Sequence, residues 1–462
     1  MTLRRTTRPA TNPPTQLAGL PVAPDAKPFI GHTWSLLRRP FAFLDALGSL
    51  GDIVRMNIGK TSVYMLTRPE LVHSILVTEA RKVQRGGVFF DRVRNDLVTQ
   101  KGLGTAEGRF HLQRRRLMQP ALHRNNVGVY VDLMRTNTRE LSASWADGQV
   151  VELDRAVYGV ITENTADSMF GIGLSAEMSS TVRWAMPVLT DNFMVRMQTP
   201  KALERFPLPA SRRFDHALRE LGKVTNKVIE RRLADLDADG DLLGMLLTTT
   251  DPDTGEPLAV EQVYDEIISA LFAGIVTTAT TLSWVFYELD RWPDVQDRVL
   301  EEIRTVLDKD LPLDEAINQL DYTRRAVTEV LRLHPILMFV RRVVEPIELG
   351  GVTLPVGTQL GYSPYTLHRD ARLYPEPMRL DPDRWLTDGA NSATSLPPGA
   401  FMPFGQGRHR CIGEFFAWAE ILVALVELLP RWKLDLVPDQ EVRALNGVLP
   451  RPSSLRMTVT AR

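Results

Sequence analysis

The segment around Cys411 carries the clearest chemical signal, because Cys411 is the only cysteine among 462 residues. Gly405 and Gly407 precede it and Gly413 follows it, directly before a helical pattern that ends at Pro430. Glycine lets the backbone form turns and approach a partner closely. A sulfur at a helix N-terminus faces unpaired N–H groups and the positive end of the helix dipole, which stabilise a thiolate. Such a thiolate can ligate iron axially and favour cleavage of an O–O bond.

A lone cysteine is more often a small buried hydrophobic residue, and only the flanking residues argue against that interpretation here. A single cysteine excludes an internal disulfide framework, an iron–sulfur cluster and a multi-cysteine zinc site. It fits a reducing compartment, so we expect a cytoplasmic protein.

Two predicted helices must position this chemistry. Residues 260–291 contain no proline and end at Trp292-Pro293, which makes this helix far longer than the usual ~11–12 residues. Its middle is rich in small and hydroxylated residues, which suit either close helix packing or a helix beside a flat cofactor or cavity. A second helix is predicted for residues 321–333, where His334-Pro335 ends it.

The remaining pattern predicts a mainly α protein with a smaller β-rich part. Residues 53–58 and 62–67 alternate as a β-hairpin does, and most of 109–307 has helical periodicity. A second β-rich portion is expected at 346–362. No repeat or linker divides the chain, so we predict a flexible leader at 1–28 and one domain at 29–462.

Composition narrows the possible partners. The formal net charge is -1 and no basic tail stands out, which argues against nucleic acid binding. No uninterrupted apolar run approaches the roughly 18–20 residues of a membrane span, so none is expected. We expect a monomer.

The spacing Phe404-Gly405-x-Gly407-x-His409-x-Cys411-x-Gly413 resembles the haem-binding signature of the cytochrome P450 family. The resemblance implies haem b (iron protoporphyrin IX) between the long helix and the cysteine loop, with Cys411 as the iron ligand. Phe404, Gly405, His409 and Gly413 would then belong to the haem-binding loop. The family often has arginine where His409 stands, and either residue can donate to a haem propionate.

Other segments resemble family motifs in the same order along the chain. Glu329 and Arg332 match a Glu-x-x-Arg pair, and Arg384 matches the arginine of a later Pro-rich segment. The resemblance implies that these three form a structural network that holds the cysteine loop. Taken without the resemblance, a Glu–Arg pair three residues apart is commonplace on a helix surface.

The middle of the long helix resembles the oxygen-activation segment of the family. The residues concerned are Ala273, Gly274, Val276, Thr277 and Thr278. The small pair would make room for dioxygen, and Thr277 would support proton delivery. Val276 departs from the pattern, because an acid usually precedes the threonine, so water, substrate or another residue must replace it.

The haem propionates have three expected ligands by the same resemblance. His111 and Arg115 lie four residues apart in a basic stretch, and Arg342 follows the Glu-x-x-Arg helix. Charge-assisted hydrogen bonds from arginine to carboxylate suit this role. Arg341 is the alternative to Arg342, one residue earlier.

The chain shows no flavin or ferredoxin domain, so the resemblance implies that NAD(P)H is used indirectly. Two electrons would arrive through a ferredoxin and a ferredoxin reductase or an equivalent pair. Arg114, Arg116, Arg408 and Arg410 are candidates to attract an acidic carrier, although solvated surface charge explains each one equally well.

The expected substrate is an apolar small molecule. The candidate pocket residues are Val88, Phe89, Phe90, Phe193, Met194, Leu337, Phe339 and Val448. Segments 363–370 and 381–385 resemble bacterial oxygenases of terpene hydrocarbons, so we predict oxidation of a sesquiterpene-like or other terpenoid substrate in secondary metabolism. The alternatives are a fatty-acid or polyketide hydroxylase, a peroxide-driven oxygenase, a haem-thiolate isomerase, and a non-catalytic haem-binding or gas-sensing protein.

Overall fold

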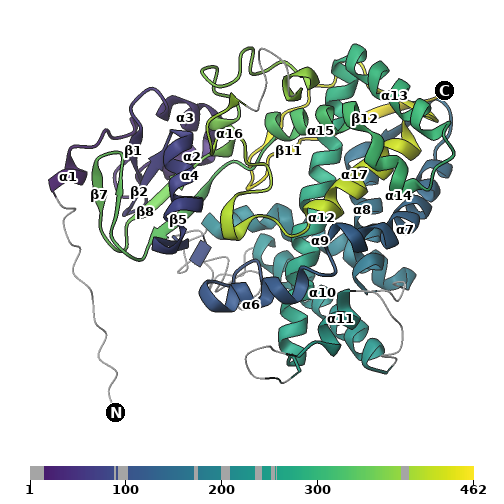
Figure 1. Ribbon diagram of the computed structural model, residues 1–462, viewed down its shortest axis with the longest axis horizontal. Coiled ribbons are helices and arrows are strands. Elements are labelled where there is room, and N and C mark those ends of the chain that lie inside the picture. The colour runs from purple at the N-terminus through teal and green to yellow at the C-terminus, as the bar shows by residue number, and fades with distance from the viewer. Residues whose placement is uncertain are drawn as a thin grey trace.

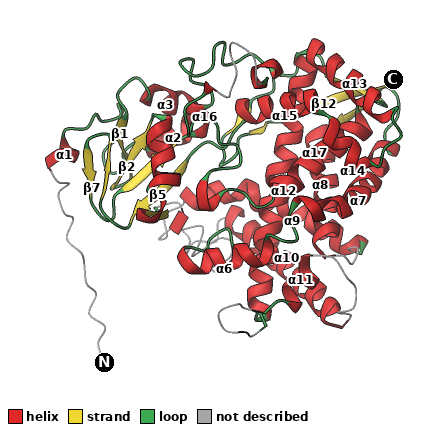
Figure 2. Ribbon diagram, viewed as in Figure 1, coloured by secondary structure: helices red, strands yellow, loops and turns green. Residues whose placement is uncertain are grey.

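Helices form the larger part of the molecule and strands the smaller part, as Figure 2 shows. The computed structural model describes residues 15–87, 90–91, 102–170, 175–198, 209–234, 242–250, 255, 257–386 and 395–462. The longer helices are α3 (Pro40–Leu47), α6 (Gly108–Met118), α7 (Arg124–Ala143), α8 (Leu153–Phe170), α9 (Ala176–Gln198), α10 (Pro209–Ala234), α12 (Val260–Arg291), α13 (Pro293–Leu307), α15 (Asp321–Leu333) and α17 (Glu414–Leu428). The shorter ones are α1 (Thr15–Ala18), α2 (Thr33–Arg38), α4 (Pro69–His73), α11 (Leu242–Thr248), α14 (Leu313–Ala316) and α16 (Pro364–Leu367).

Helix α12 runs through the helical part and has the predicted bounds. The residues at every fourth position along its first half are buried, so this stripe packs against neighbouring helices. By length and composition α12 could cross a membrane, yet 61% of its apolar stretch is buried inside the protein. Helix α12 is therefore a core helix. The prediction for α15 is also confirmed, from Asp321 to Leu333.

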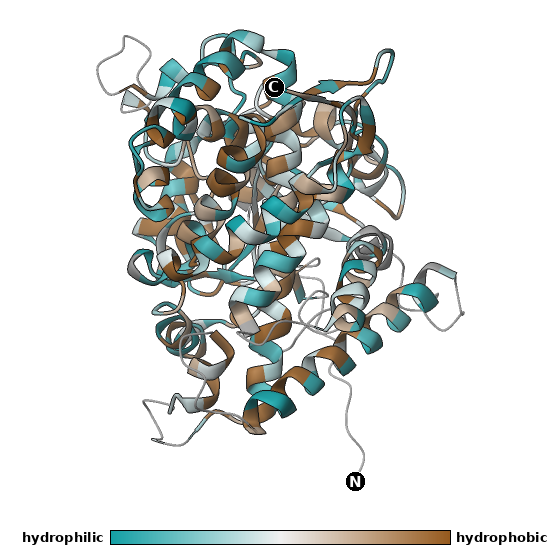
Figure 3. Ribbon diagram, turned by 90° about the vertical axis from the view of Figure 1, so that its right-hand side faces the viewer, coloured by the Kyte–Doolittle hydropathy of each residue, from teal (hydrophilic) through white to brown (hydrophobic). Residues whose placement is uncertain are grey.

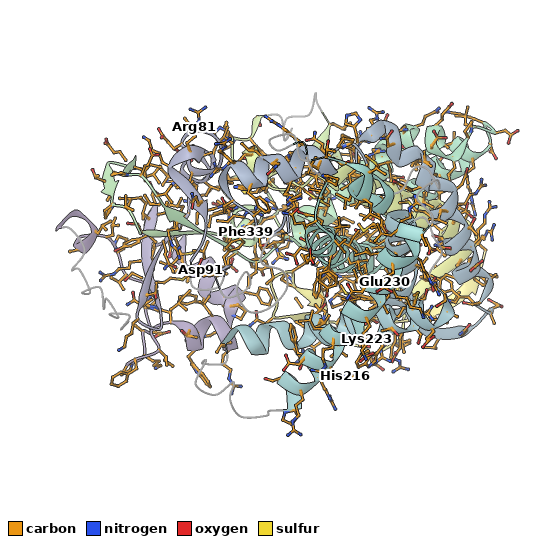
Figure 4. All side chains as sticks on the ribbon, turned by 90° about the horizontal axis from the view of Figure 1, so that it is seen from below. Arg81, Asp91, His216, Lys223, Glu230 and Phe339 are labelled. Carbon is orange, nitrogen blue, oxygen red and sulfur yellow. The ribbon has the colours of Figure 1, made fainter. Side chains whose placement is uncertain are left out.

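The helices around α12 are amphipathic, and Figure 3 shows hydrophobic and hydrophilic residues on different sides of them. In α10, Phe214, Ala217 and Leu221 are fully buried. His216 and Lys223, spaced seven residues apart, lie on the exposed side of the same helix (Figure 4). This division of residue types fixes which face of α10 covers the core.

The main sheet lies at the opposite end of the molecule from the helical bundle (Figure 1). Its strand order is β1-β2-β8-β5-β3, and β2 pairs with β8 in parallel. The strands are β1 (Ile53–Ile58), β2 (Thr61–Leu66), β3 (Val83–Arg85), β5 (Phe339–Val343) and β8 (Gln359–Tyr362), with a separate hairpin of β6 (Ile347–Leu349) and β7 (Val352–Leu354). The predicted first strand is confirmed, and the second starts and ends one residue earlier than predicted.

Two small sheets near the helical bundle have no counterpart in the prediction. One has the order β4-β12-β9, from Gln149–Glu152, Arg456–Ala461 and Trp432–Leu436, and the other pairs β10 (Ala444–Leu445) with β11 (Arg451–Pro452). Strand β4 pairs with β12, about 300 residues later, so no local sequence pattern predicts β4.

The flexible leader predicted for residues 1–28 is wrong for its second half. Leu17 and Ala23 are buried, and the N–H of Ala23 donates to the carbonyl of Arg55 at 2.9 Å. Leu17 therefore packs with residues of the main sheet and Val22 pairs with Arg55 of β1, whereas residues 24–28 are exposed. Residues 1–14 lie outside the described part of the chain.

Candidate haem site and oxygen-activation face

The loop before α17 is a sequence of tight turns that ends at Cys411. Gly405 and Gly407 have positive φ angles of 71° and 66°. A Cβ atom on Gly407 would lie 2.0 Å from the carbonyl oxygen of Leu76, so only glycine fits there. The N–H of Cys411 donates to the carbonyl of Phe404 at 2.8 Å. The loop thus delivers the sulfur to the N-terminus of α17, as the glycine pattern predicts.

Opposing effects act on the Cys411 thiol. Burial and the nearby Glu414 carboxylate raise its pKa, and they outweigh the lowering effect of the Gly413 N–H and of the positive charges of Arg115 and Arg410. Although protein atoms surround the sulfur closely, Cys411 is an exposed residue. An approaching metal ion would add the positive charge that a thiolate requires.

A buried polar cluster lies beside this loop. His409 Nδ1 and His111 Nε2 are 3.2 Å apart, and Arg85 Nε donates to Glu107 Oε1 at 2.7 Å. Burial, together with the nearby positive charges, lowers the pKa of His111 to about 3 and that of His409 to about 4. Burial raises the pKa of Glu107, but its interactions with His409 and Arg85 outweigh this and lower it to about 2.

Arg342 was the predicted propionate ligand and Arg341 the alternative, and the register of β5 favours Arg341. Arg341 lies opposite Arg85 and Arg342 lies opposite Gln84 in the pairing of β3 with β5. Side chains of directly opposed residues share a sheet face, so Arg341 joins the polar cluster. Arg341 is buried and donates to Tyr362 Oη at 3.1 Å, whereas Arg342 is half-exposed and forms an ion pair with Asp91. The predicted ligand Arg342 thus faces away from the cluster.

Arg115 binds the cysteine loop. It donates through Nη1 to the carbonyl of Arg410, the residue before Cys411, at 2.5 Å. Its α6 neighbour Arg114, by contrast, is buried 3.7 Å from Glu266 of α12. The basic stretch of this helix is therefore divided between the cysteine loop, the core and the surface.

The polar cluster fits the two carboxylates that haem carries. Arg85 and Arg341 bring two positive charges, and Glu107 brings one negative charge. Within the described residues, the buried His111 Nδ1 atom has no hydrogen-bond partner, and His409 Nε2 lies 3.6 Å from Glu107 Oε2. Buried polar atoms are normally paired, so the cluster has donors to spare for added carboxylates.

One face of α12 carries exposed residues although most of this helix is buried. Ala273 and Thr277, one turn apart, are exposed, although the residues around them in this core helix are mostly buried. Thr277 Oγ1 donates to the carbonyl of Ala273 at 2.6 Å. Gly274 lies on the flank toward α8, where a Cβ atom would be 3.2 Å from Thr165 Cγ2.

The neighbours of Thr277 face in different directions. Val276 packs against an apolar cluster formed with residues of α9, α10 and α11. Thr278 is buried on the other flank, where it is a hydrogen-bond partner of Glu420 in α17. Helices α12 and α17 lie side by side at the centre of Figure 1.

The predicted network of Glu329, Arg332 and Arg384 is assembled in the structure. Arg332 donates to both carboxylate oxygens of Glu329, at 2.9 and 2.7 Å, and Arg384 Nε donates to Oε1 at 3.2 Å. Trp385 Nε1 donates to Oε2 at 2.8 Å, a partner that the prediction missed. Glu329 and Arg332 are completely buried.

The predicted pocket residues have mixed outcomes. Leu337 is buried and its N–H donates to the carbonyl of the exposed Val448 at 2.9 Å, so this pair is brought together. Phe339 is half-buried beside Tyr362, with the ring centroids 5.4 Å apart (Figure 4). Phe90 lies 5.7 Å from the Arg85 guanidinium, near the polar cluster. The structure does not describe the side chains of the remaining candidates, Val88, Phe89, Phe193 and Met194.

Sequence reasoning did not find Arg85, Glu107, Trp385 or Glu420. Arg85 and Glu107 are separated by 22 residues, and only the pairing of β3 with β5 brings Arg85 to the cluster. Trp385 directly follows Arg384, a predicted network residue, so its position in the sequence could have predicted its contact with Glu329.

Comparison with known proteins agrees with this architecture. Residues 21–458 match the family described as Cytochrome P450. The chain is 36% identical over 443 residues to pentalenene oxygenase of Streptomyces avermitilis, covering 95% of this chain and 97% of the relative. It is also 36% identical to cyclooctat-9-en-7-ol 5-monooxygenase of Streptomyces melanosporofaciens, covering 90% of each chain.

A solved structure has the same fold. Retinoic acid bound cyanobacterial CYP120A1 superposes with a TM-score of 0.84 at 23% identity, covering 96% of this chain and 100% of that one. The family match spans nearly the whole chain and includes the cysteine loop, α12 and the Glu329 network. The protein is therefore a haem-dependent monooxygenase that belongs to the cytochrome P450 family.

Proposed function

We propose that this enzyme inserts one oxygen atom from dioxygen into an apolar terpenoid, by hydroxylation or by stepwise oxidation. The proposal is carried by the near full-length similarity to pentalenene oxygenase and cyclooctat-9-en-7-ol 5-monooxygenase, whose names both refer to terpenoids. Electrons would come from NAD(P)H through a ferredoxin and its reductase. The enzyme would act as a monomer in the bacterial cytoplasm.

The residues of the cysteine loop and the polar cluster would hold haem b. When bound, haem supplies the iron centre at which dioxygen is activated. Cys411 would ligate the iron as thiolate, and the Gly413 N–H would hold part of its negative charge. His111, His409 and Arg341 would donate to the propionates, because they bury donor groups in one cluster.

The exposed face of α12 would contribute the oxygen side of the site. Ala273 presents only a methyl group there, so dioxygen has room beside the helix. The Thr277 hydroxyl is exposed on the same face and can hold or move a proton at Oγ1. Val276 packs against the apolar cluster beside this face and brings no charge to it, which is consistent with an apolar substrate.

Surface charge beside the cysteine would favour an acidic electron carrier. Arg116 is exposed, and Arg410 is exposed with its guanidinium on Glu414 at 2.8 Å. The other two candidates are less available, because Arg114 is buried and Arg408 Nη2 donates to the carbonyl of Val83 at 2.6 Å. Replacing Arg116 with glutamate should slow reduction by ferredoxin, more strongly at low salt.

The test begins with absorption spectra of the reduced, CO-bound holoprotein and the Cys411→Ser variant. We expect a strongly red-shifted Soret band that the variant lacks, with haem content and circular dichroism reporting whether the variant folds. Wild type should then show spin-state changes and product formation with terpene hydrocarbons, ferredoxin, reductase and NAD(P)H. Exclusive oxidation of fatty acids or polyketides would overturn the terpenoid assignment.

A peroxide-driven oxygenase is the second candidate, and Val276 is the observation that favours it. Position 276 packs against an apolar cluster and offers no acid for proton delivery. Turnover with hydrogen peroxide but none with ferredoxin, reductase and NAD(P)H would establish this alternative. No oxidation under either condition would favour a haem-binding or gas-sensing role.

A further inference from the structure

A turn at residues 102–106 lies against the first half of α12. The N–H of Leu103 donates to Glu266 Oε2 at 2.8 Å, and the N–H of Gly104 donates to Ser269 Oγ at 3.2 Å. A Cβ atom on Gly104 would lie 2.8 Å from the same Ser269 Oγ, so this close approach of the backbone requires glycine. Two side chains of the long helix therefore hold the backbone of the turn.

Arg85 holds the same turn from its other side. The Arg85 guanidinium donates to the carbonyls of Leu103 at 3.1 Å, Gly104 at 2.8 Å and Ala106 at 2.5 Å. The same side chain forms the ion pair with Glu107 in the polar cluster. The turn therefore connects the polar cluster to α12, with its carbonyls bound on one side and its N–H groups on the other.

Glu266 lies on the same face of α12 as Ala273 and Thr277. Seven and then four positions separate these residues along the helix, which is close to two turns and one turn. Glu266 is buried where the turn covers it, whereas Ala273 and Thr277 are exposed. At ~1.5 Å per residue, Ser269 lies about 6 Å along the helix from Ala273. The turn thus borders the exposed part of this face.

A cation, Arg114 of α6, faces the buried Glu266 carboxyl group. Arg114 Nε is 3.7 Å from Glu266 Oε1, which is too long for a hydrogen bond. Asp265, the preceding residue of α12, adds a negative charge nearby. Burial raises the pKa of Glu266 to about 7, against the lowering effects of the Leu103 N–H and of Arg114. The carboxyl group therefore changes its charge near neutral pH.

We propose that Glu266 is a positioning residue for the substrate. It fixes the turn at residues 102–106 as a wall of the substrate chamber and so sets how an apolar molecule lies beside Ala273 and Thr277. The inference rests on the proposed function, in which this face of α12 forms the oxygen side of the site. Glu266 acts only through the turn, because its own side chain is buried. The charge is thus kept away from an apolar substrate.

Hydrogen exchange tests the contact between the turn and α12 without turnover. Glu266→Gln retains an accepting oxygen but loses the negative charge, so the Leu103 and Gly104 amides should exchange roughly tenfold faster. Glu288→Gln is the matched control, because Glu288 is also buried on α12 but contacts His334 at 2.8 Å near the other end of the helix. Equal rates in wild type and Glu266→Gln would overturn the inference.

The pH dependence of exchange separates charge from packing. Above pH 7 the Glu266 carboxylate accepts the Leu103 N–H strongly, and protonation below pH 7 weakens this acceptor. Protection of the Leu103 amide, corrected for intrinsic exchange, should decrease as pH falls through about 7 in wild type and stay constant in Glu266→Gln. Flat profiles in both proteins would exclude a role for the charge of Glu266.

Two iron ligands of different size measure the wall in the holoenzyme by absorption spectroscopy. Imidazole and 4-phenylimidazole both bind haem iron through nitrogen, but only the phenyl group extends along the chamber. We expect the dissociation constant of 4-phenylimidazole to rise about fivefold in Glu266→Gln, because the phenyl group loses apolar contact, while that of imidazole changes less than about twofold. An unchanged ratio of the two constants would overturn the role of Glu266 in the chamber.

Gly104→Ala and Ser269→Ala give a second pair of variants, which keeps the test open if Glu266→Gln loses haem. The new methyl group overlaps Ser269 Oγ, so Gly104→Ala should change the product ratio from a terpene that wild type oxidises. Adding Ser269→Ala removes the overlap and should restore the ratio in part. The same products from all these variants would overturn the proposed wall. Failure of wild type to oxidise any terpene would instead overturn the proposed function, and the exchange and imidazole measurements would still decide the role of Glu266.

Discussion

The imidazole of His368 accepts a hydrogen bond from the backbone N–H of Met402 at 3.0 Å. The carbonyl of the same residue accepts a hydrogen bond from Arg332 at 2.7 Å, and the carbonyl of Met402 accepts one from the N–H of Gly405. His368 therefore links the Glu329 network directly to the cysteine loop. Because Nε2 is the acceptor, the link requires an imidazole that carries no proton there.

This link predicts acid sensitivity of the folded state. Burial and the charges of Arg332 and Arg369 lower the pKa of His368 from 6.5 to about 3. Between these values the unfolded chain binds the proton and the folded chain does not, so stability falls as pH decreases from about 6.5 to about 3. One such group contributes a slope of at most about 1.4 kcal/mol per pH unit.

His368→Gln should reduce this slope by up to that amount, although the variant is less stable at neutral pH. Urea unfolding of both proteins at several pH values measures the two slopes. Identical slopes over this pH range would show that protonation of His368 does not limit stability in acid.

Glu329→Gln should destabilise the protein more than any single surface change. The variant leaves the buried guanidinium groups of Arg332 and Arg384 without their carboxylate, at an expected cost of about 3–5 kcal/mol. Haem retention should fall with it, because the network adjoins the cysteine loop. Unfolding by urea and the Soret absorbance per mole of protein measure the two effects.

Asp383→Asn is the matched control in the same segment. Asp383 pairs with Arg298 at 2.9 Å on the surface, where such a pair contributes at most about 1 kcal/mol. Equal losses in the two variants would contradict a special role for the buried network.

The sequence predicted best the helices that end at a nearby proline. Helices α12 and α15 end where Trp292-Pro293 and His334-Pro335 interrupt the helical pattern, so their bounds could be predicted to the residue. The cysteine loop was equally predictable, because its positive φ angles require glycine at fixed positions.

The parts that were missed depend on pairing between distant segments. Strand β5 is apolar on both faces around two adjacent arginines, so nothing in its sequence shows which arginine faces the cluster. Only the register with β3, more than 250 residues earlier, decides between them. Glu420 was missed for the same reason, since its hydroxyl partners come from α8 and α12.

Gly407→Ala should disrupt the haem loop, whereas Gly59→Ala should not. Both glycines have positive φ angles, 66° and 58°, so each substitution carries the backbone strain of about 1–2 kcal/mol. Only at Gly407 does the new Cβ also overlap the carbonyl oxygen of Leu76, while nothing lies within 4 Å at Gly59. We expect loss of the thiolate-type CO spectrum in Gly407→Ala alone, and the same spectrum in both variants would refute the steric argument.

Arg341→Gln and Arg342→Gln give the last prediction, which compares adjacent residues of one strand. Each variant removes one positive charge, but only Arg341 lies on the face that carries Arg85. A hydrogen bond to a charged group contributes about 1.5–3 kcal/mol, so Arg341→Gln should weaken haem binding roughly tenfold or more. Arg342→Gln breaks its exposed pair with Asp91 and should change haem binding less than threefold, or about 0.6 kcal/mol. The rate of haem transfer to an acceptor protein measures both effects, and a larger effect of Arg342→Gln would restore Arg342 as the propionate ligand.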